Sequence, residues 1–185
     1  SELEEIIKKL RKLVEDVARR NEELIKKLEE TNKRLEDEVR ELIEEIKKLI
    51  DELAETVKRI EDRRTLEDLI RKIKEEVEEL LRRIRERVKE VDKEDKDLIK
   101  RIHDDNREIL KRLEELLRRA EDKVKDEEMK KRLRDVAEKL KEDVRDLDRK
   151  VKKVAKESHE RNRRILKELE EVAARVTERL EELRR

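Results

Sequence analysis

The sequence predicts an all-α protein, a long antiparallel (up-down-up) three-helix bundle. Charged residues make up 61% of the 185 residues, the apolar residues are almost all aliphatic, and Gly, Pro, Cys, Trp, Tyr and Phe are absent. The aliphatic residues recur every three or four positions along three long stretches, a spacing that places them on one face of a helix. Strong helix formers therefore dominate, and nothing in the chain favours a sheet.

The first aliphatic stripe, with a few polar substitutes, runs from Leu3 to Ile60 at a spacing close to the 3.6 residues of an α-helical turn. It predicts one helix over about residues 2–61. A second row of aliphatic residues, including Ile6 and Ile43, widens the stripe. A helix that packs against two neighbours needs such a wide face.

The stripe fails at residues 61–64 and resumes after Thr65. We expect Thr65 to cap the second helix, with Asp68 in the capping-box position three residues later. A second break follows at 125–127, where Asp126 is the expected N-cap of the third helix. The predicted helices of about 60 residues form a single domain over residues 1–185 and span about 2–61, 66–123 and 127–184.

Residues 92–97 are polar enough to form a loop that would divide the second helix. The aliphatic spacing passes through them in phase, however, and this favours a continuous helix. Because the repeat lies near 3.6 rather than 3.5, we also expect nearly straight helices with little supercoil.

Several polar residues interrupt the aliphatic rows. If the first hairpin is centred between Arg63 and Arg64, residue i lies opposite about residue 127 − i, so Asn21 is level with Asn106, and Asn32 with Asp95. We therefore predict two buried hydrogen-bond clusters. The alternative is that several of these side chains lean toward solvent at the helix edges. One predicted cluster comprises Asn21, His103 and Asn106, and the other comprises Thr31, Asn32, Asp95, Ser158, His159 and Asn162.

The expected role of these clusters is to specify helix register. A buried amide that loses its partner costs about 1–3 kcal/mol, so a slipped register is penalised. The motif His-x-x-Asn occurs twice, beginning at His103 and at His159. It allows an alternative in which buried imidazoles become protonated in mild acid and loosen the bundle or an oligomer.

Composition argues against most biochemical activities. Lys and Arg number 56, as do Asp and Glu, and the signs are interleaved, so no basic face and no aromatic platform for nucleic acid is expected. No aliphatic run is long enough for a membrane span. The two histidines lie far apart and cysteine is absent, which argues against a metal or other cofactor. Without a pocket, carboxylate pairs do not indicate an enzyme or a small-molecule substrate.

The chain resembles computationally designed helical bundles with built-in hydrogen-bond networks. The features that carry the resemblance are a Glu/Lys/Arg surface, as in E-E-I-K-K-L-I-D-E-L, an aliphatic core, and isolated polar residues at matched heights. It implies a soluble, highly stable scaffold or self-assembly module without a natural substrate, expected in the cytoplasm of an expression host. Such designs often use Gly or Pro in their loops, and this chain has neither.

Other classes of protein remain open. A natural spectrin-like or coiled-coil spacer would share the helices but would be expected to contain aromatic residues and Gly. An apolipoprotein-like lipid binder would need large apolar faces with aromatic anchors. The wide stripes are compatible with a monomer or with a homo-oligomer, for example a trimer, in which the Asn and His residues meet their own copies.

Overall fold

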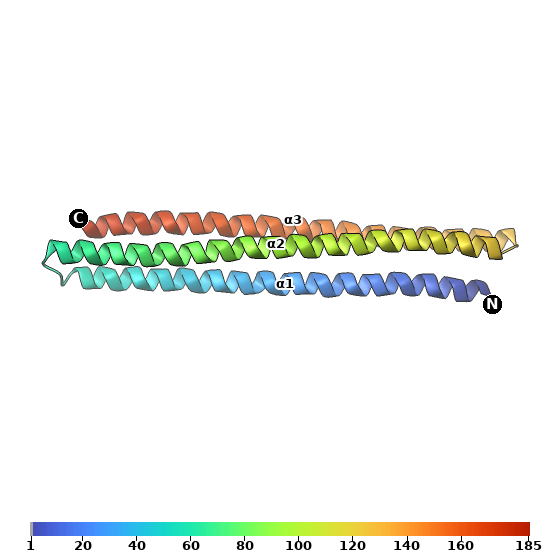
Figure 1. Cartoon of the computed structure of the whole chain (residues 1–185), viewed down its shortest axis with the longest axis horizontal. Coiled ribbons are helices and arrows are strands. Elements are labelled where there is room, and N and C mark those ends of the chain that lie inside the picture. The colour runs from blue at the N-terminus through green and yellow to red at the C-terminus, as the bar shows by residue number, and fades with distance from the viewer. Residues whose placement is uncertain (1) are drawn as a thin grey trace. The chain divides into compact units, whose positions relative to one another are not determined.

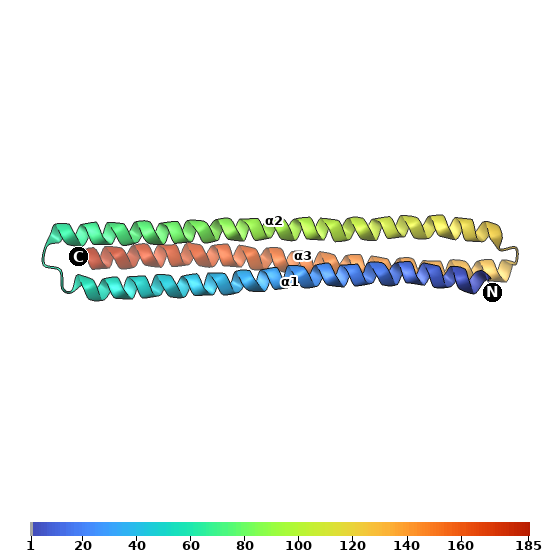
Figure 2. The same ribbon diagram turned by 60° about the horizontal axis from the view of Figure 1, so that its bottom comes forward.

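The protein consists of three helices, α1 (Glu2–Val57), α2 (Arg63–Lys123) and α3 (Glu127–Arg184), joined by short connections at 58–62 and 124–126 (Figures 1 and 2). This computed structural model describes residues 2–185, and within that range it contains no strand. The helices have 56, 61 and 58 residues. The predicted all-α, three-helix architecture is confirmed, whereas the small supercoil stays a prediction.

The backbone packs into two compact units, and each contains a segment of all three helices. Unit 1 comprises Ser1–Glu29 and Glu94–Glu157, and unit 2 comprises Glu30–Lys93 and Ser158–Arg185. The single domain over residues 1–185 stays a prediction.

Contacts within the units define the direction of the helices. In unit 1, α2 meets α3 through Glu121–Arg134 at 2.7 Å and Glu114–Lys141 at 3.6 Å. Residue numbers fall along one helix as they rise along the other, so these helices are antiparallel.

In unit 2, α1 meets α3 through Asn32–Ser158 at 3.4 Å and Glu36–Arg161 at 3.2 Å. Here the residue numbers rise together, so α1 and α3 run parallel, as an up-down-up order requires.

The core of each unit is aliphatic. In unit 1, Val17, Leu113, Leu133 and Val144 are fully buried, and a smaller group around Ile102 forms a second cluster. A third cluster fills unit 2 with the stripe residues of all three helices. Each fully buried side chain of this kind contributes about 1.5–3 kcal/mol relative to exposure. The stripes of the sequence are therefore what holds the helices together.

The first connection differs from the prediction. Helix α1 ends at Val57 rather than near residue 61, and α2 begins at Arg63 rather than 66. The carbonyl oxygen of Asp62 accepts the Leu66 N–H at 3.1 Å. Asp62 is therefore the N-cap of α2, and the predicted Thr65–Asp68 capping box is wrong.

The side chain of Asp62 explains this start. Its Oδ1 accepts the Arg64 N–H at 3.4 Å, and its Oδ2 accepts the Thr65 hydroxyl at 2.7 Å. A carboxylate at the N-cap also interacts favourably with the positive end of the helix dipole, which a Thr hydroxyl does not match. Thr65 thus supports the cap from the first turn.

The other boundary predictions are confirmed. Asp126 caps α3, because its Oδ1 accepts the Glu128 N–H at 3.1 Å and its carbonyl accepts the Lys130 N–H at 3.0 Å. Residues 92–97 are helical, so α2 is continuous and the loop alternative is wrong.

Exposed charges pair mainly along single helices, at spacings of three and four residues. Glu79, for example, accepts hydrogen bonds from Arg82 at 2.7 Å and from Arg83 at 3.1 Å. The Arg82 guanidinium is the main reason that the pKa of Glu79 is lowered to about 2. Exposed pairs of this kind contribute little stability individually. The surface charges therefore do not determine the fold.

The cap of α2 provides a test by titration. The Thr65 hydroxyl, followed by the Arg64 N–H, holds the pKa of Asp62 below its ordinary value of 3.8. Stability contributed by this carboxylate is therefore present above pH 3.8 and is lost as the pH falls through the lowered pKa. In Thr65→Ala we expect the pKa of Asp62 to rise toward 3.8, measured by carbon-detected NMR of the side-chain carboxyl.

Thr56→Ala is the matched control, because the Thr56 hydroxyl donates to the Glu52 carbonyl at 2.9 Å and not to Asp62. An Asp62 pKa that stays low in Thr65→Ala would contradict this account of the cap.

Candidate functional site

A reciprocal amide pair joins α1 to α2 in the interior of unit 1. Asn21 and Asn106 are 2% and 1% exposed. Asn21 Nδ2 donates to Asn106 Oδ1 at 2.8 Å, and Asn106 Nδ2 donates to Asn21 Oδ1 at 3.1 Å. The second N–H of Asn21 donates to the Val17 carbonyl at 2.8 Å. The two residues lie opposite each other, as the 127 − i relation predicts.

Asp148 extends this pair to α3. Its Oδ1 accepts the second N–H of Asn106 at 3.4 Å and lies 2.9 Å from His103 Nδ1. Because a carboxylate only accepts hydrogen bonds, the His103 ring nitrogen is the donor. The Lys152 ammonium lies 3.8 Å from Asp148 Oδ2. The cluster therefore links all three helices, and sequence analysis missed its acceptor on α3.

This polar layer interrupts the aliphatic core of unit 1. The larger apolar cluster contains Val17 and Ile109, and the smaller one contains Ile25 and Ile102. The Asn21–Asn106 pair lies between these positions on both α1 and α2. A change of register would therefore place amides against aliphatic side chains.

Unit 2 contains a second polar cluster. Asn162 Nδ2 donates to Asp92 Oδ1 at 3.0 Å, and His159 Nδ1 lies 3.5 Å from the same oxygen. Asn32 Nδ2 donates to Ser158 Oγ at 3.4 Å. Asn32, Ser158 and Asn162 are 0%, 3% and 2% exposed.

The two histidines lie at the helix edges rather than in the interior. The side chain of His159 is 51% exposed, so its predicted burial is wrong, and that of His103 is 40% exposed. Their carboxylate partners, Asp92 and Asp148, are themselves 22% and 20% exposed. Each imidazole and its carboxylate partner therefore lie at the edge of the helices, where water solvates both.

Two further residues were predicted for the second cluster. Thr31 is half-buried in unit 2, while Asp95 is buried in unit 1. The predicted level pairing of Asn32 with Asp95 stays a prediction.

The two clusters repeat one arrangement with the helices exchanged. In unit 1, His103 and Asn106 on α2 contact Asp148 on α3. In unit 2, the His159 and Asn162 side chains on α3 contact Asp92 on α2. All three residue types recur at an interval of 56 residues. Comparing the second and third helices at this interval would have identified both aspartates.

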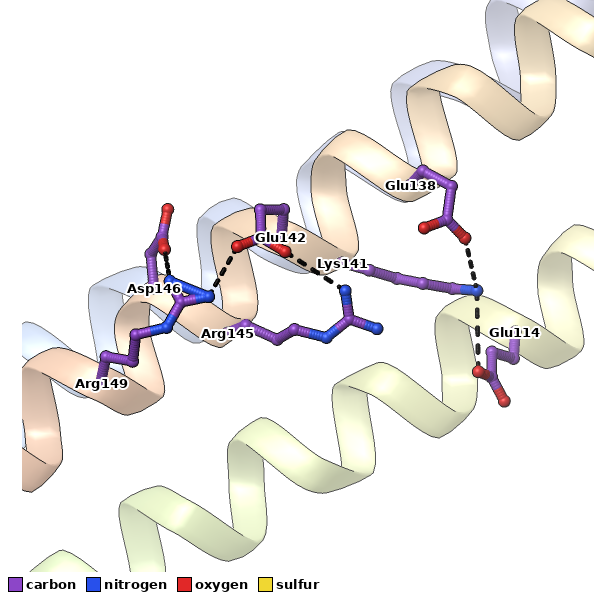
Figure 3. A network of polar contacts seen from close by, with 7 residues as sticks. All are labelled: Glu114, Glu138, Lys141, Glu142, Arg145, Asp146 and Arg149. Carbon is purple, nitrogen blue, oxygen red and sulfur yellow. Dashed lines mark hydrogen bonds and ion pairs between the residues drawn. The ribbon is translucent and has the colours of Figure 1, made fainter.

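A buried lysine is a further residue that sequence analysis missed (Figure 3). Lys141 is 8% exposed, and its ammonium lies 3.4 Å from Glu138 and 3.6 Å from Glu114 of α2. Its spacing after Ala137 and before Val144 places it on the widened apolar face of α3. Its aliphatic stem can thus pack on the core while the charge reaches the edge.

Exposed charged residues of α3 near Lys141 pair with one another (Figure 3). Arg149 Nη2 lies 2.6 Å from Glu142 Oε1, and Arg145 Nη1 lies 3.3 Å from Glu142 Oε2. Arg149 also pairs with Asp146. These charges are solvated, so only Lys141 belongs to the interior.

The chemistry of these clusters is directional hydrogen bonding. Among residues 2–185, no group of three or more His, Asp or Glu side chains is arranged to hold a metal ion. In the same part of the chain, no helix is long and apolar enough to cross a membrane. What the clusters can do is fix the relative height of the helices that they join.

Substitution of the amide pair tests its energetics. In Asn21→Leu, the Asn106 amide loses a buried partner, and we expect a loss of about 1–3 kcal/mol in the free energy of unfolding. The double variant with Asn106→Leu should cost less than the sum of the single variants, with a coupling of about 0.5–3 kcal/mol. Urea denaturation of all four proteins measures it.

Asn21→Leu combined with Asn162→Leu is the control, because these residues belong to different clusters. Their effects should add within about 0.5 kcal/mol. Additive effects for Asn21 and Asn106 as well would show that the pair is not coupled.

Substitution of Lys141 tests whether its ion pairs stabilise the fold. Glu114 and Glu138 are 55% and 65% exposed and remain hydrated without the lysine. We expect Lys141→Met, which keeps most of the apolar stem, to stay within about 1 kcal/mol of the parent protein in urea denaturation. A loss above about 3 kcal/mol would instead show that the ion pairs are essential.

Comparisons with known proteins find similarity to a solved structure. No protein-family model and no curated protein matches it. Among solved structures, it is similar to a chain described as a computationally designed three-helix bundle. The two are 19% identical over 99% of this chain and 84% of the other, with a TM-score of 0.44. The protein itself is a three-helix bundle whose buried polar residues make hydrogen bonds.

Proposed function

We propose that the protein is a structural scaffold of designed origin, without a natural biochemical activity. Its buried polar residues specify which helix faces pack together and at what height. The observation that carries this proposal is the reciprocal hydrogen bonding of Asn21 and Asn106 in an otherwise aliphatic core.

Specificity explains the amide pair better than stability does. An intramolecular hydrogen bond contributes only about 0.5–1.5 kcal/mol net, and two aliphatic side chains of similar shape would be nearly equivalent. A slip of one helical turn moves the partners about 5.4 Å apart, which breaks bonds of 2.8 and 3.1 Å. The pair therefore adds little to the correct register while destabilising the wrong ones.

Composition supports a designed origin. A natural helical spacer of 185 residues would be expected to contain aromatic residues and Gly, and this chain contains none. The surface is nearly all Glu, Lys, Arg and Asp, with equal numbers of both signs. The repeated His/Asn/Asp arrangement is likewise consistent with deliberate placement of a small set of polar residues.

The geometry gives little support to a pH-dependent switch. Both imidazoles are about half exposed, and His103 lies against the Asp148 carboxylate. Protonation would place a positive charge beside that carboxylate and strengthen the contact. This effect is opposite to the loosening that a switch requires.

Pairing within one chain also favours a monomer over an oligomer. Both amide groups of the Asn21–Asn106 pair are satisfied inside a single chain. They do not need the copies of themselves that a homotrimer would supply.

The test separates specificity from stability. We expect the parent protein to sediment as one species of 22.8 kDa. Asn21→Leu with Asn106→Leu should remain helical by circular dichroism but sediment as a mixture of species, with fewer and broader NMR resonances. The reason is that an all-aliphatic layer accepts several registers and partners.

Ile25→Leu with Ile102→Leu is the matched control, since it alters two core residues of the same unit without changing polarity. It should stay homogeneous. A double Asn variant that is as homogeneous as this control would argue against a role in specificity, and a parent mass that is a multiple of 22.8 kDa would argue against the monomer.

A further inference from the structure

A surface groove in unit 2 runs between α1 and α3. It holds about 210 Å³ and has an aliphatic floor. The floor residues follow helical spacing on both helices, and along α1 they extend from Ile43 to Ile50, which is about 10 Å. The floor consists of Ile43, Ile46 and Ile50 from α1 and Val172 and Val176 from α3.

The rim of this groove is positively charged. Three cations, Lys47, Arg175 and Arg179, face one acid, Asp51. Lys47 and Arg175 make only long ion pairs along their own helices, at 3.8 Å to Glu44 and 4.0 Å to Glu171.

Within residues 2–185, Arg179 makes no ion pair shorter than 4 Å. The rim thus has two cations in long ion pairs, Lys47 and Arg175, and a third, Arg179, for which the described residues provide no ion pair within 4 Å.

Three other grooves differ from this one in their floor or in their charge. One lies between the same two helices and sets four cations, Arg40, Lys47, Arg161 and Arg164, against three acids, Glu36, Glu44 and Glu168. A groove in unit 1 has Arg11, Arg19 and Arg132 among its lining residues, but Ile7 is its one aliphatic residue. A groove between α2 and α3 in unit 2 has an aliphatic floor, but its rim has two cations, Lys74 and Arg85, and one acid, Glu78, and so a smaller excess of positive charge.

We propose that the groove between α1 and α3 in unit 2 binds a single-chain amphipathic anion, such as an alkyl sulfate or a fatty carboxylate. The alkyl tail lies along the isoleucine floor, and the anionic head lies between Arg175 and Arg179. Guanidinium groups suit this head because they donate two parallel hydrogen bonds to a carboxylate or sulfate. The groove is smaller than the roughly 300–1,000 Å³ of pockets for drug-sized molecules, so a narrow chain fits better than a ring system.

This site is separate from the polar clusters and does not depend on their role in register. A bundle could therefore bind such a ligand whether or not its Asn residues specify packing.

The experiment is a titration of the whole chain with hexyl, octyl and decyl sulfate below their micelle concentrations. Binding is followed by methyl NMR of labelled Ile and Val. We expect the resonances of Ile43, Ile50 and Val176 to shift, with the dissociation constant falling about two- to fourfold for each CH₂ added. Decyltrimethylammonium, with the same tail and the opposite charge, should bind at least tenfold more weakly, and salt should weaken decyl sulfate binding.

Two variants test the head-group contacts. Arg175→Glu with Arg179→Glu should weaken decyl sulfate binding at least tenfold, while Asp51→Asn should strengthen it. Arg11→Glu with Arg19→Glu makes the same change in net charge in unit 1 and should bind like the parent. Circular dichroism checks that each variant remains helical.

Three outcomes would overturn the proposal. In the first, the sulfate and the ammonium bind equally well. In the second, the unit 1 variant loses binding instead, which would place the anion there. In the third, the groove is covered by a second copy of the chain, which sedimentation would detect as a dimer that Arg175→Glu with Arg179→Glu dissociates.

Discussion

The aliphatic core holds the helices together but does not by itself fix their relative height, and the rest of the structure depends on this constraint. Contacts between Leu, Ile and Val depend on area and volume, so many relative heights of two helices bury nearly the same surface. The long stripes supply the attraction that forms the bundle. The amides of Asn21 and Asn106 supply direction, because a hydrogen bond weakens steeply when its atoms are displaced. The aliphatic residues thus provide the attraction between the helices, and the asparagines favour one relative height.

Sequence reasoning succeeded where one residue type in one spacing has a single physical meaning. The aliphatic period predicted three helices and the continuity of α2, and the hairpin geometry predicted that Asn21 faces Asn106. It failed where the residues that matter are of the same type as many others in the chain. Asp92, Lys141 and Asp148 are three charged residues among 112, and the two aspartates are distinguished only when the second and third helices are compared at the 56-residue interval. At the first hairpin, the prediction placed the cap at Thr65, whereas the backbone contacts of Asp62 place it three residues earlier.

The repeated His/Asn/Asp arrangement joins two helices through three polar side chains. In each unit one carboxylate at the helix edge accepts from an amide deeper in the bundle and lies beside an imidazole nearer to water. In both units the carboxylate oxygen that accepts from the amide also lies within 3.5 Å of the imidazole nitrogen. Partial exposure reduces the desolvation that a fully buried carboxylate would suffer. The arrangement can therefore be reused on exchanged helices without a specially shaped pocket.

The polar layer in unit 1 also affects how that unit opens. Because it separates two aliphatic clusters, side chains on one side do not support those on the other by direct apolar contact. Local opening that begins near the connection at 124–126 meets a boundary at Asn106, where the next step must expose amides and a carboxylate rather than more aliphatic surface. The helix is continuous there, but we expect its protection from hydrogen exchange to differ between the segments on either side of Asn106. The same buried amide that joins α1 to α2 therefore also forms a boundary between the two apolar clusters of unit 1.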